Sequence, residues 1–165
     1  QETVYTFGEY IRHYVNDIRQ RGATPILLTL TPRNDYEPDN PTRIQRKLGT
    51  FTPWIIDMAR ELHTPFIDLN DISATKLEHY GPWKADYHFF GDKIHSSVFG
   101  AKMNAASFAQ GIEASDDPQL QLLRQSIKPE AIHPQRIDQA RRPGLPEVFT
   151  CGDSTGGRSG SGKYR

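Results

Sequence analysis

Apolar residues recur at helical intervals in three long segments of the chain. In residues 6–22 they recur every three or four positions, and Thr6 stands three residues before Glu9, which is the spacing of a capping box. The same steps run through 48–62 and 97–112. We therefore expect three amphipathic helices, the last of them rich in alanine and suited to lie close against a sheet.

Short, almost wholly apolar runs alternate with these helices. Residues 25–31 and 65–70 each begin with proline and suit strands that are buried on both faces in a parallel sheet. A short helix is expected at 71–81, a polar and aromatic loop at 81–96 and one more strand at 147–152. The alternation of helix and strand predicts a doubly wound α/β sheet.

Two further segments are polar and interrupted by proline. Residues 31–43 are expected to form a loop after the first strand. Residues 113–146, rich in Asp, Gln, Arg and Pro, are expected to form a connector with at most a short helix near 118–127.

The composition narrows the possible partners. Apolar residues make up 36% of the chain and charged residues 24%, and the formal net charge is zero, so we expect no nucleic-acid partner. No apolar run approaches the length of a membrane-spanning helix, and the first residues lack the order of a secretory signal. The single Cys151 cannot form an internal disulfide, so stability must come from packing.

Two short motifs could carry chemistry together. Gly152-Asp153-Ser154 follows a predicted strand, where α/β proteins display nucleophiles, but a serine hydroxyl is nearly inert until a base takes its proton. Asp92 and His95 are three residues apart before the last helix, a spacing that lets the carboxylate reach the imidazole Nδ1 and leaves Nε2 to face a serine. A lone D-x-x-H pair is weak evidence, and the serine motif strengthens it.

These motifs resemble the two outer sequence blocks of the SGNH or GDSL hydrolases, which are serine esterases and lipases on a flavodoxin-like sheet. The likeness is closer to the rhamnogalacturonan acetylesterases, where D-x-x-H is followed by a Gly-Ala pair, here Gly100-Ala101, and then by an Asn-Ala pair. It covers 2–112 almost continuously and 147–165 again. The resemblance implies a flavodoxin-like three-layer αβα sandwich with a mostly parallel sheet, and a secreted or periplasmic setting.

The order of the blocks departs from the family. There the GDS block opens the domain, whereas here Ser154 follows His95, and the middle blocks that complete the oxyanion hole are absent. We divide the chain into the end of an SGNH-like domain at 1–112, a connector at 113–146 and a nucleophile block at 147–165. From this order we expect a fold that is incomplete or permuted. Either the chain returns to one active site, which a connector of this length allows, or Ser154 belongs to a following domain.

The resemblance also implies roles for individual residues. Ser154 would attack an acetyl carbonyl of a plant cell-wall polysaccharide or oligosaccharide, and its backbone N–H would donate to the oxyanion. His95 would carry the proton and Asp92 would orient the ring. No cofactor or metal is expected. For contact with the sugar we expect Trp83, Arg33 and Asn34, while Trp54 on a helix face is expected in the core.

Rival readings remain for the end of the chain. Residues 157–164 match the start of a phosphate loop, but Tyr164 stands where Ser or Thr should bind magnesium. A flexible tail also fits the glycine and serine there, and Cys151 reads better as a buried thiol than as a nucleophile. For the whole chain, the alternative to an esterase is a catalytically incomplete SGNH-like domain that serves as a carbohydrate-binding or interaction module.

Overall fold

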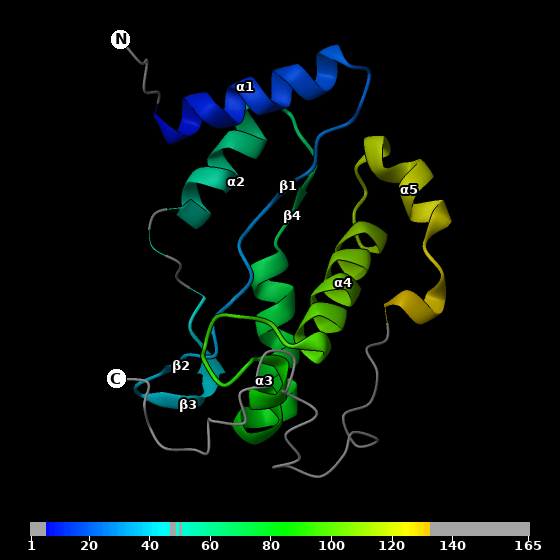
Figure 1. Cartoon of the computed structure of the whole chain (residues 1–165). Helices are drawn as coiled ribbons and strands as arrows, with labels where there is room; N and C mark the ends of the chain where they lie inside the picture. Colours follow the sequence, from blue (N-terminus) through cyan, green and yellow to red (C-terminus); the bar gives the residue numbers. More distant parts are fainter. Residues whose placement is uncertain (1–5, 47–48, 50, 133–165) are drawn as a thin grey trace, which may run out of the picture.

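The computed structural model describes residues 6–46, 49 and 51–132. α1 and α2 lie together in the upper part of Figure 1, β1 and β4 run side by side, and α3 and α4 lie below them. The elements of the described residues are α1 (Phe7–Gln20), β1 (Leu27–Leu28), β2 (Tyr36–Glu37), β3 (Asn40–Ile44), α2 (Phe51–Glu61), β4 (Phe66–Ile67), α3 (Leu69–Ala85), η1 (Asp86–His88), α4 (Val98–Glu113), η2 (Pro118–Leu120), α5 (Gln121–Ser126) and η3 (Pro129–Ala131).

The helices expected from apolar periodicity are confirmed. Thr6 caps α1, because its hydroxyl accepts a hydrogen bond of 3.4 Å from the backbone N–H of Glu9. Ser97 caps α4 in the same way, accepting from the backbone N–H of Gly100 at 3.3 Å. The short helix expected near 118–127 is present as η2 and α5.

One parallel pair of strands stands at the centre of the fold. β1 and β4 pair in parallel, with Leu27 opposite Phe66 and Leu28 opposite Ile67. Just past their carboxyl ends, the Thr29 hydroxyl donates to Asp68 at 2.8 Å and accepts from the backbone N–H of Asn70 at 2.8 Å. A mixed α/β fold is therefore confirmed, while the three-layer sandwich stays a prediction, because the described residues form only this one parallel pair.

The buried core lies on the α3 and α4 side of the molecule. Leu77 and Ala74 of α3 are fully buried, as is Ile44 at the end of β3. Gly111 lets α4 approach β4 closely, because a Cβ at this position would stand 2.3 Å from the Ile67 side chain. Helix α4 thus covers the parallel pair with its small-residue face.

The segment 31–43, expected to be a loop, contains a hairpin instead. β2 pairs antiparallel with β3, whose residues are exposed except for the last, Ile44. Arg46, just beyond, forms ion pairs of 2.5 Å with Asp71 and with Glu78, and the Glu78 carboxylate also accepts from the backbone N–H of Ile44. The loop prediction was wrong because contacts with α3, distant in sequence, hold this segment.

The segment 81–96, also expected to be a loop, begins with helix. The backbone of Gly81 has φ +78°, which kinks α3, and Pro82 then starts another turn that continues to Ala85 and into η1. Only the stretch from Phe89 onward is a loop. The strand expected at 147–152, and the connector beyond Ile132, lie outside the described residues.

Candidate active site

Asp92 and His95 lie in a closed turn between η1 and α4. The Phe90 N–H donates to the His95 carbonyl at 3.0 Å, and the Ser97 N–H donates to the His88 carbonyl at 2.9 Å. Gly91 has φ +78°, a left-handed conformation that glycine adopts without strain. These bonds tie both ends of the turn together and fix where it presents its side chains.

The Asp92 carboxylate holds the His95 ring in one orientation. Its Oδ2 lies 2.6 Å from Nδ1 of His95, while Oδ1 accepts from the backbone N–H groups of Ile94 at 2.8 Å and of His95 at 2.7 Å. The hydrogen bond from His95 and the two backbone donors lower the pKa of Asp92 to about 2. Asp92 is therefore ionised near neutral pH, Nδ1 donates the proton, and Nε2 of the neutral ring keeps a lone pair.

This pair is open to solvent. The His95 side chain is 75% exposed and that of Asp92 is 46% exposed. The imidazole can therefore exchange a proton with a group brought to it, and the arrangement matches the base and the carboxylate of a nucleophile-base-carboxylate triad.

The turn is fastened to the segment that follows β1. The Asn34 N–H donates to the Lys93 carbonyl at 2.9 Å, and Lys93 Nζ lies 2.7 Å from an Asp35 carboxylate oxygen. Since residues 31–35 follow the carboxyl end of β1, the Asp92–His95 pair is held beside that end of the parallel pair.

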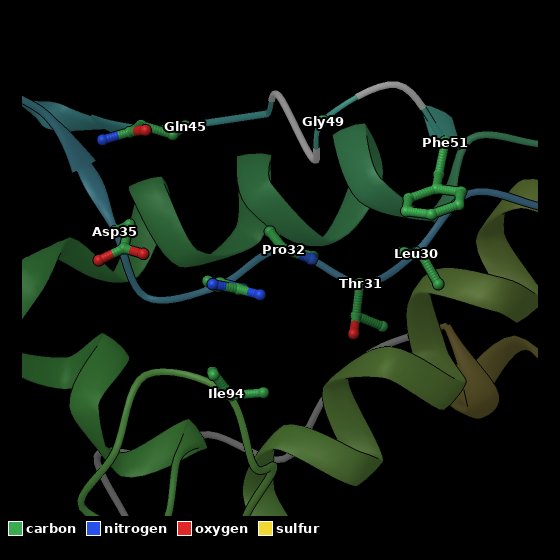
Figure 2. Close-up of a pocket in the computed structure, with 9 residues that line it drawn as sticks. Leu30, Thr31, Pro32, Asp35, Gln45, Gly49, Phe51 and Ile94 are labelled. Atoms are coloured by element: carbon green, nitrogen blue, oxygen red, sulfur yellow. The ribbon is translucent and has the colours of Figure 1, made fainter. Parts of the chain in front are cut away.

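A cavity of about 610 Å³ adjoins the pair. Ile94, between the two polar residues in sequence, lies across the cavity from Thr31 and Pro32 (Figure 2). The walls combine residues that follow β1, a residue after β3 and the start of α2. The lining residues are Leu30, Thr31, Pro32, Arg33, Asp35, Gln45, Gly49, Phe51 and Ile94.

The three side chains expected to contact a sugar have different positions. Arg33 lines the cavity and is exposed. Asn34 is buried, and its side-chain amide donates to the Asp86 carboxylate at 2.5 Å, which ties the loop after β1 to η1. Trp83 lies on the last turn of α3, is 58% exposed and contacts Tyr87 edge to face at 5.6 Å, but does not line this cavity.

Sequence reasoning missed most of the cavity lining. Gln45 and Phe51 belong to segments that reach the cavity only through tertiary contacts. Ile94 was not considered, because it occupies an unspecified position of the D-x-x-H motif. The one available signal was the position of 31–35 after an apolar strand, which pointed to Arg33.

Several expected residues cannot be placed. Ser154, its backbone N–H as an oxyanion donor, and Cys151 all lie outside the described residues. Trp54, expected in the core, is instead 45% exposed, although its ring contacts those of Phe7 and Phe51.

Within 6–46, 49 and 51–132, no three His, Cys, Asp or Glu side chains gather as metal ligands. No helix in this part of the chain is both long and apolar enough to cross a membrane. His88 is buried and stacks on Tyr80 at 4.9 Å, and its burial lowers the pKa of the imidazole.

A curated protein and a solved structure, both distant in sequence, are similar to this chain. The chain is 28% identical over 122 residues to the rhamnogalacturonan acetylesterase RhgT of Bacillus subtilis. The aligned residues cover 66% of this chain and 52% of RhgT. It resembles the crystal structure of the protein YxiM of Bacillus subtilis with a TM-score of 0.60 and 26% identity, over 65% of this chain and 30% of that one. No family model matches the sequence. The chain thus has distant homology to an acetylesterase and spans about half of its length.

Proposed function

We propose that this chain belongs to a serine carbohydrate esterase that removes acetyl groups from a plant cell-wall polysaccharide such as rhamnogalacturonan. The observation that carries the proposal is the 2.6 Å contact between Asp92 and His95 at the carboxyl end of β1. Distant homology to an acetylesterase supports a hydrolase of carbohydrate esters in general. The acetyl group, the sugar and a secreted or periplasmic setting rest on resemblance.

The proposed reaction uses the pair as base and orienting group. The Ser154 oxygen attacks the acetyl carbonyl while Nε2 of His95 takes the hydroxyl proton, and Asp92 stabilises the imidazolium that forms. The tetrahedral intermediate collapses as His95 returns the proton to the departing sugar oxygen, which leaves an acetyl ester on Ser154. Water, activated by the same nitrogen, then releases acetate and regenerates the serine. The Ser154 backbone N–H would donate to the oxyanion in both halves.

The charged residues that line the cavity support an anionic polysaccharide as the substrate. Arg33 forms no ion pair with any residue in the described part of the chain, and the carboxylate of Asp35 is paired with Lys93. Among the described residues, Arg33 is therefore the one cation of the cavity lining, and no carboxylate balances it. A guanidinium suits the carboxylates that a pectic polysaccharide carries on its uronate units.

Hydrolysis of 4-nitrophenyl acetate tests the proposal. We expect His95→Ala and Ser154→Ala each to lower kcat/KM by about three orders of magnitude, because each removes one member of a unit that acts together. His13→Ala, an exposed histidine of α1, is the matched control and should leave the rate unchanged. Turnover that survives His95→Ala would contradict the mechanism.

A serine-reactive fluorophosphonate separates the two arrangements of the chain. If Ser154 and His95 share one centre, the wild type is labelled at Ser154 and His95→Ala is not. Labelling that is equal in both would place Ser154 in a different centre from His95.

The openness of the pair favours one second candidate, a binding module that lacks turnover. In that case the chain would bind acetylated polysaccharide but release no acetate from it, and Arg33→Gln would weaken binding while His95→Ala would not. Acetate release from the same polysaccharide decides between the two functions.

A further inference from the structure

A second cavity, of about 510 Å³, lies between α3 and α4 and is separate from the Asp92–His95 turn. One turn of α3 supplies most of its wall, α4 supplies the facing side, and a residue after η3 closes it. The lining residues are Thr75, Lys76, His79, Tyr80, Gln110, Glu113 and Ile132.

Lys76 is the unusual member of this lining. Its Nζ is buried and has no hydrogen-bond partner among the residues that the structure describes. A buried ammonium without a partner is strongly unfavourable, and buried charges in proteins are normally paired. Desolvation also lowers the pKa of Lys76, which agrees with a missing counter-charge.

The nearby carboxylates of α3 are already committed elsewhere. Glu78 and Asp71 both pair with Arg46, and the Thr75 hydroxyl accepts a further hydrogen bond from that guanidinium at 3.0 Å. These two carboxylates already balance the Arg46 guanidinium, so neither is left for the ammonium of Lys76. The Thr75 hydroxyl still has its own proton to donate.

The rest of the cavity limits what could balance Lys76. Besides Lys76, the titratable groups of the lining are His79, Tyr80 and Glu113. Glu113 and His79 are exposed, so a dianion would meet the negative charge of Glu113. The half-buried Tyr80 ring, stacked on His88, and the Ile132 side chain provide apolar surface. The space favours a ligand with one negative charge and an apolar body.

We propose that this cavity binds an organic monocarboxylate, with its carboxylate paired to Lys76 and its apolar part against Tyr80 and Ile132. Rotation about the lysine stem turns the ammonium toward the bound anion. The Thr75 hydroxyl and the Gln110 amide supply further donors. The site uses no residue of the proposed esterase centre, so it stands whether or not the chain hydrolyses esters.

Titration of the ¹⁵N-labelled chain with benzoate tests this site, with benzamide as the neutral molecule of matching shape. We expect benzoate to shift amide signals of 75–80 and 110–113, and benzamide to bind at least about tenfold more weakly, since it lacks the charge. Inorganic phosphate, the dianionic alternative, should bind more weakly than benzoate. Equal binding of benzoate and benzamide, tighter phosphate binding, or no shifts in these residues would overturn the proposal.

Two lysine variants test whether the Lys76 ammonium binds the benzoate carboxylate. Lys76→Met keeps an unbranched side chain of nearly the same length without the charge and should abolish benzoate binding. Lys102→Met, which changes a lysine of α4 outside the cavity, should not. Benzoate should also raise the Tm of the wild type and not that of Lys76→Met. Benzoate binding that persists in Lys76→Met contradicts the proposal, and if this variant fails to fold, the benzoate and benzamide comparison in the wild type decides alone.

Discussion

The α3–α4 region and the α1–α2 region use similar apolar periodicity with opposite results. In the first region the apolar face is buried, as Leu77 and Met103 show with 0% and 2% exposure. In α1 Val15 is buried, but much of the stripe that predicts the helix stays accessible, with Tyr10 at 41% and Tyr14 at 62% exposure. Periodicity therefore predicts that a helix forms, but which neighbour covers it depends on the rest of the fold.

The candidate active site lies where the two regions meet. Leu30 and Phe51, both partly exposed, belong to the α1–α2 side, while Ile94 comes from the turn that precedes α4. Leu30 and Phe51 also line a smaller apolar cavity of about 320 Å³ with residues of α1 and α2. The packed region thus holds the Asp92–His95 pair in place, and the open region supplies an accessible wall.

Truncating one leucine in each region gives the largest expected contrast. Leu77→Ala should lower the free energy of unfolding by about 3 kcal/mol, because it leaves a cavity in a close-packed core. Leu30→Ala removes the same atoms at 57% exposure and should change it by less than about 1 kcal/mol. Urea unfolding at constant m value measures both. Equal losses would show that the α1–α2 region is covered in solution.

Two glycines near the starts of helices should give smaller changes in the free energy of unfolding, with opposite signs, when each is replaced by alanine. A Cβ on Gly100 would stand 2.1 Å from the His88 carbonyl oxygen, so Gly100→Ala should destabilise the chain by about 2 kcal/mol. A Cβ on Gly8 would meet only Met58 Sδ at 3.4 Å and Arg12 Nη1 at 3.6 Å. Gly8→Ala should stabilise by up to about 1 kcal/mol, since alanine favours helix.

Thermal unfolding of the two variants beside the wild type checks this pair. A stable Gly100→Ala would mean that the start of α4 moves away from η1 without loss. That result would weaken the view that packing in this region fixes the turn that carries His95.

Local signals in the sequence were sufficient to predict the helices and one contact of the candidate active site. Thr6 and Ser97 cap helices that begin at the next residue, because capping depends only on neighbouring residues. The three-residue spacing of Asp92 and His95 likewise predicted that the carboxylate reaches Nδ1. Each of these features lies within one turn of chain.

Features that depend on distant partners were missed. The β2–β3 hairpin relies on Arg46 and on Glu78 of α3, and no pattern within 31–43 indicates either. Gly81 was read as the end of a helix, although Pro82 is suited to start the next turn. Trp54 was expected in the core because aromatic residues on a helix face usually are, but the surface that would cover it is not formed by the described residues.

The pH dependence of stability gives the smallest and most local contrast, because it reports the Asp92–His95 pair itself. The pKa of Asp92 is about 2, against 3.8 for the unperturbed group, so ionised Asp92 stabilises the folded state. This contribution is complete above pH 4 and is lost as the pH falls toward 2. Since the Asp92 side chain is 46% exposed, solvent screening keeps it below about 1 kcal/mol.

Asp92→Asn removes that contribution, so the wild type should be the more stable protein at pH 6, and the difference should shrink as the pH falls from 4 to 2. Urea unfolding at each pH measures the difference, and Asp116→Asn, an exposed aspartate after α4, shows what loss of a charge does by itself. A difference that stayed constant down to pH 2 would mean that Asp92 is not held by His95 and the backbone donors in solution. The turn would then lack the order that a catalytic base requires, and the contrast between a packed region that fixes the pair and an open region beside it would no longer hold.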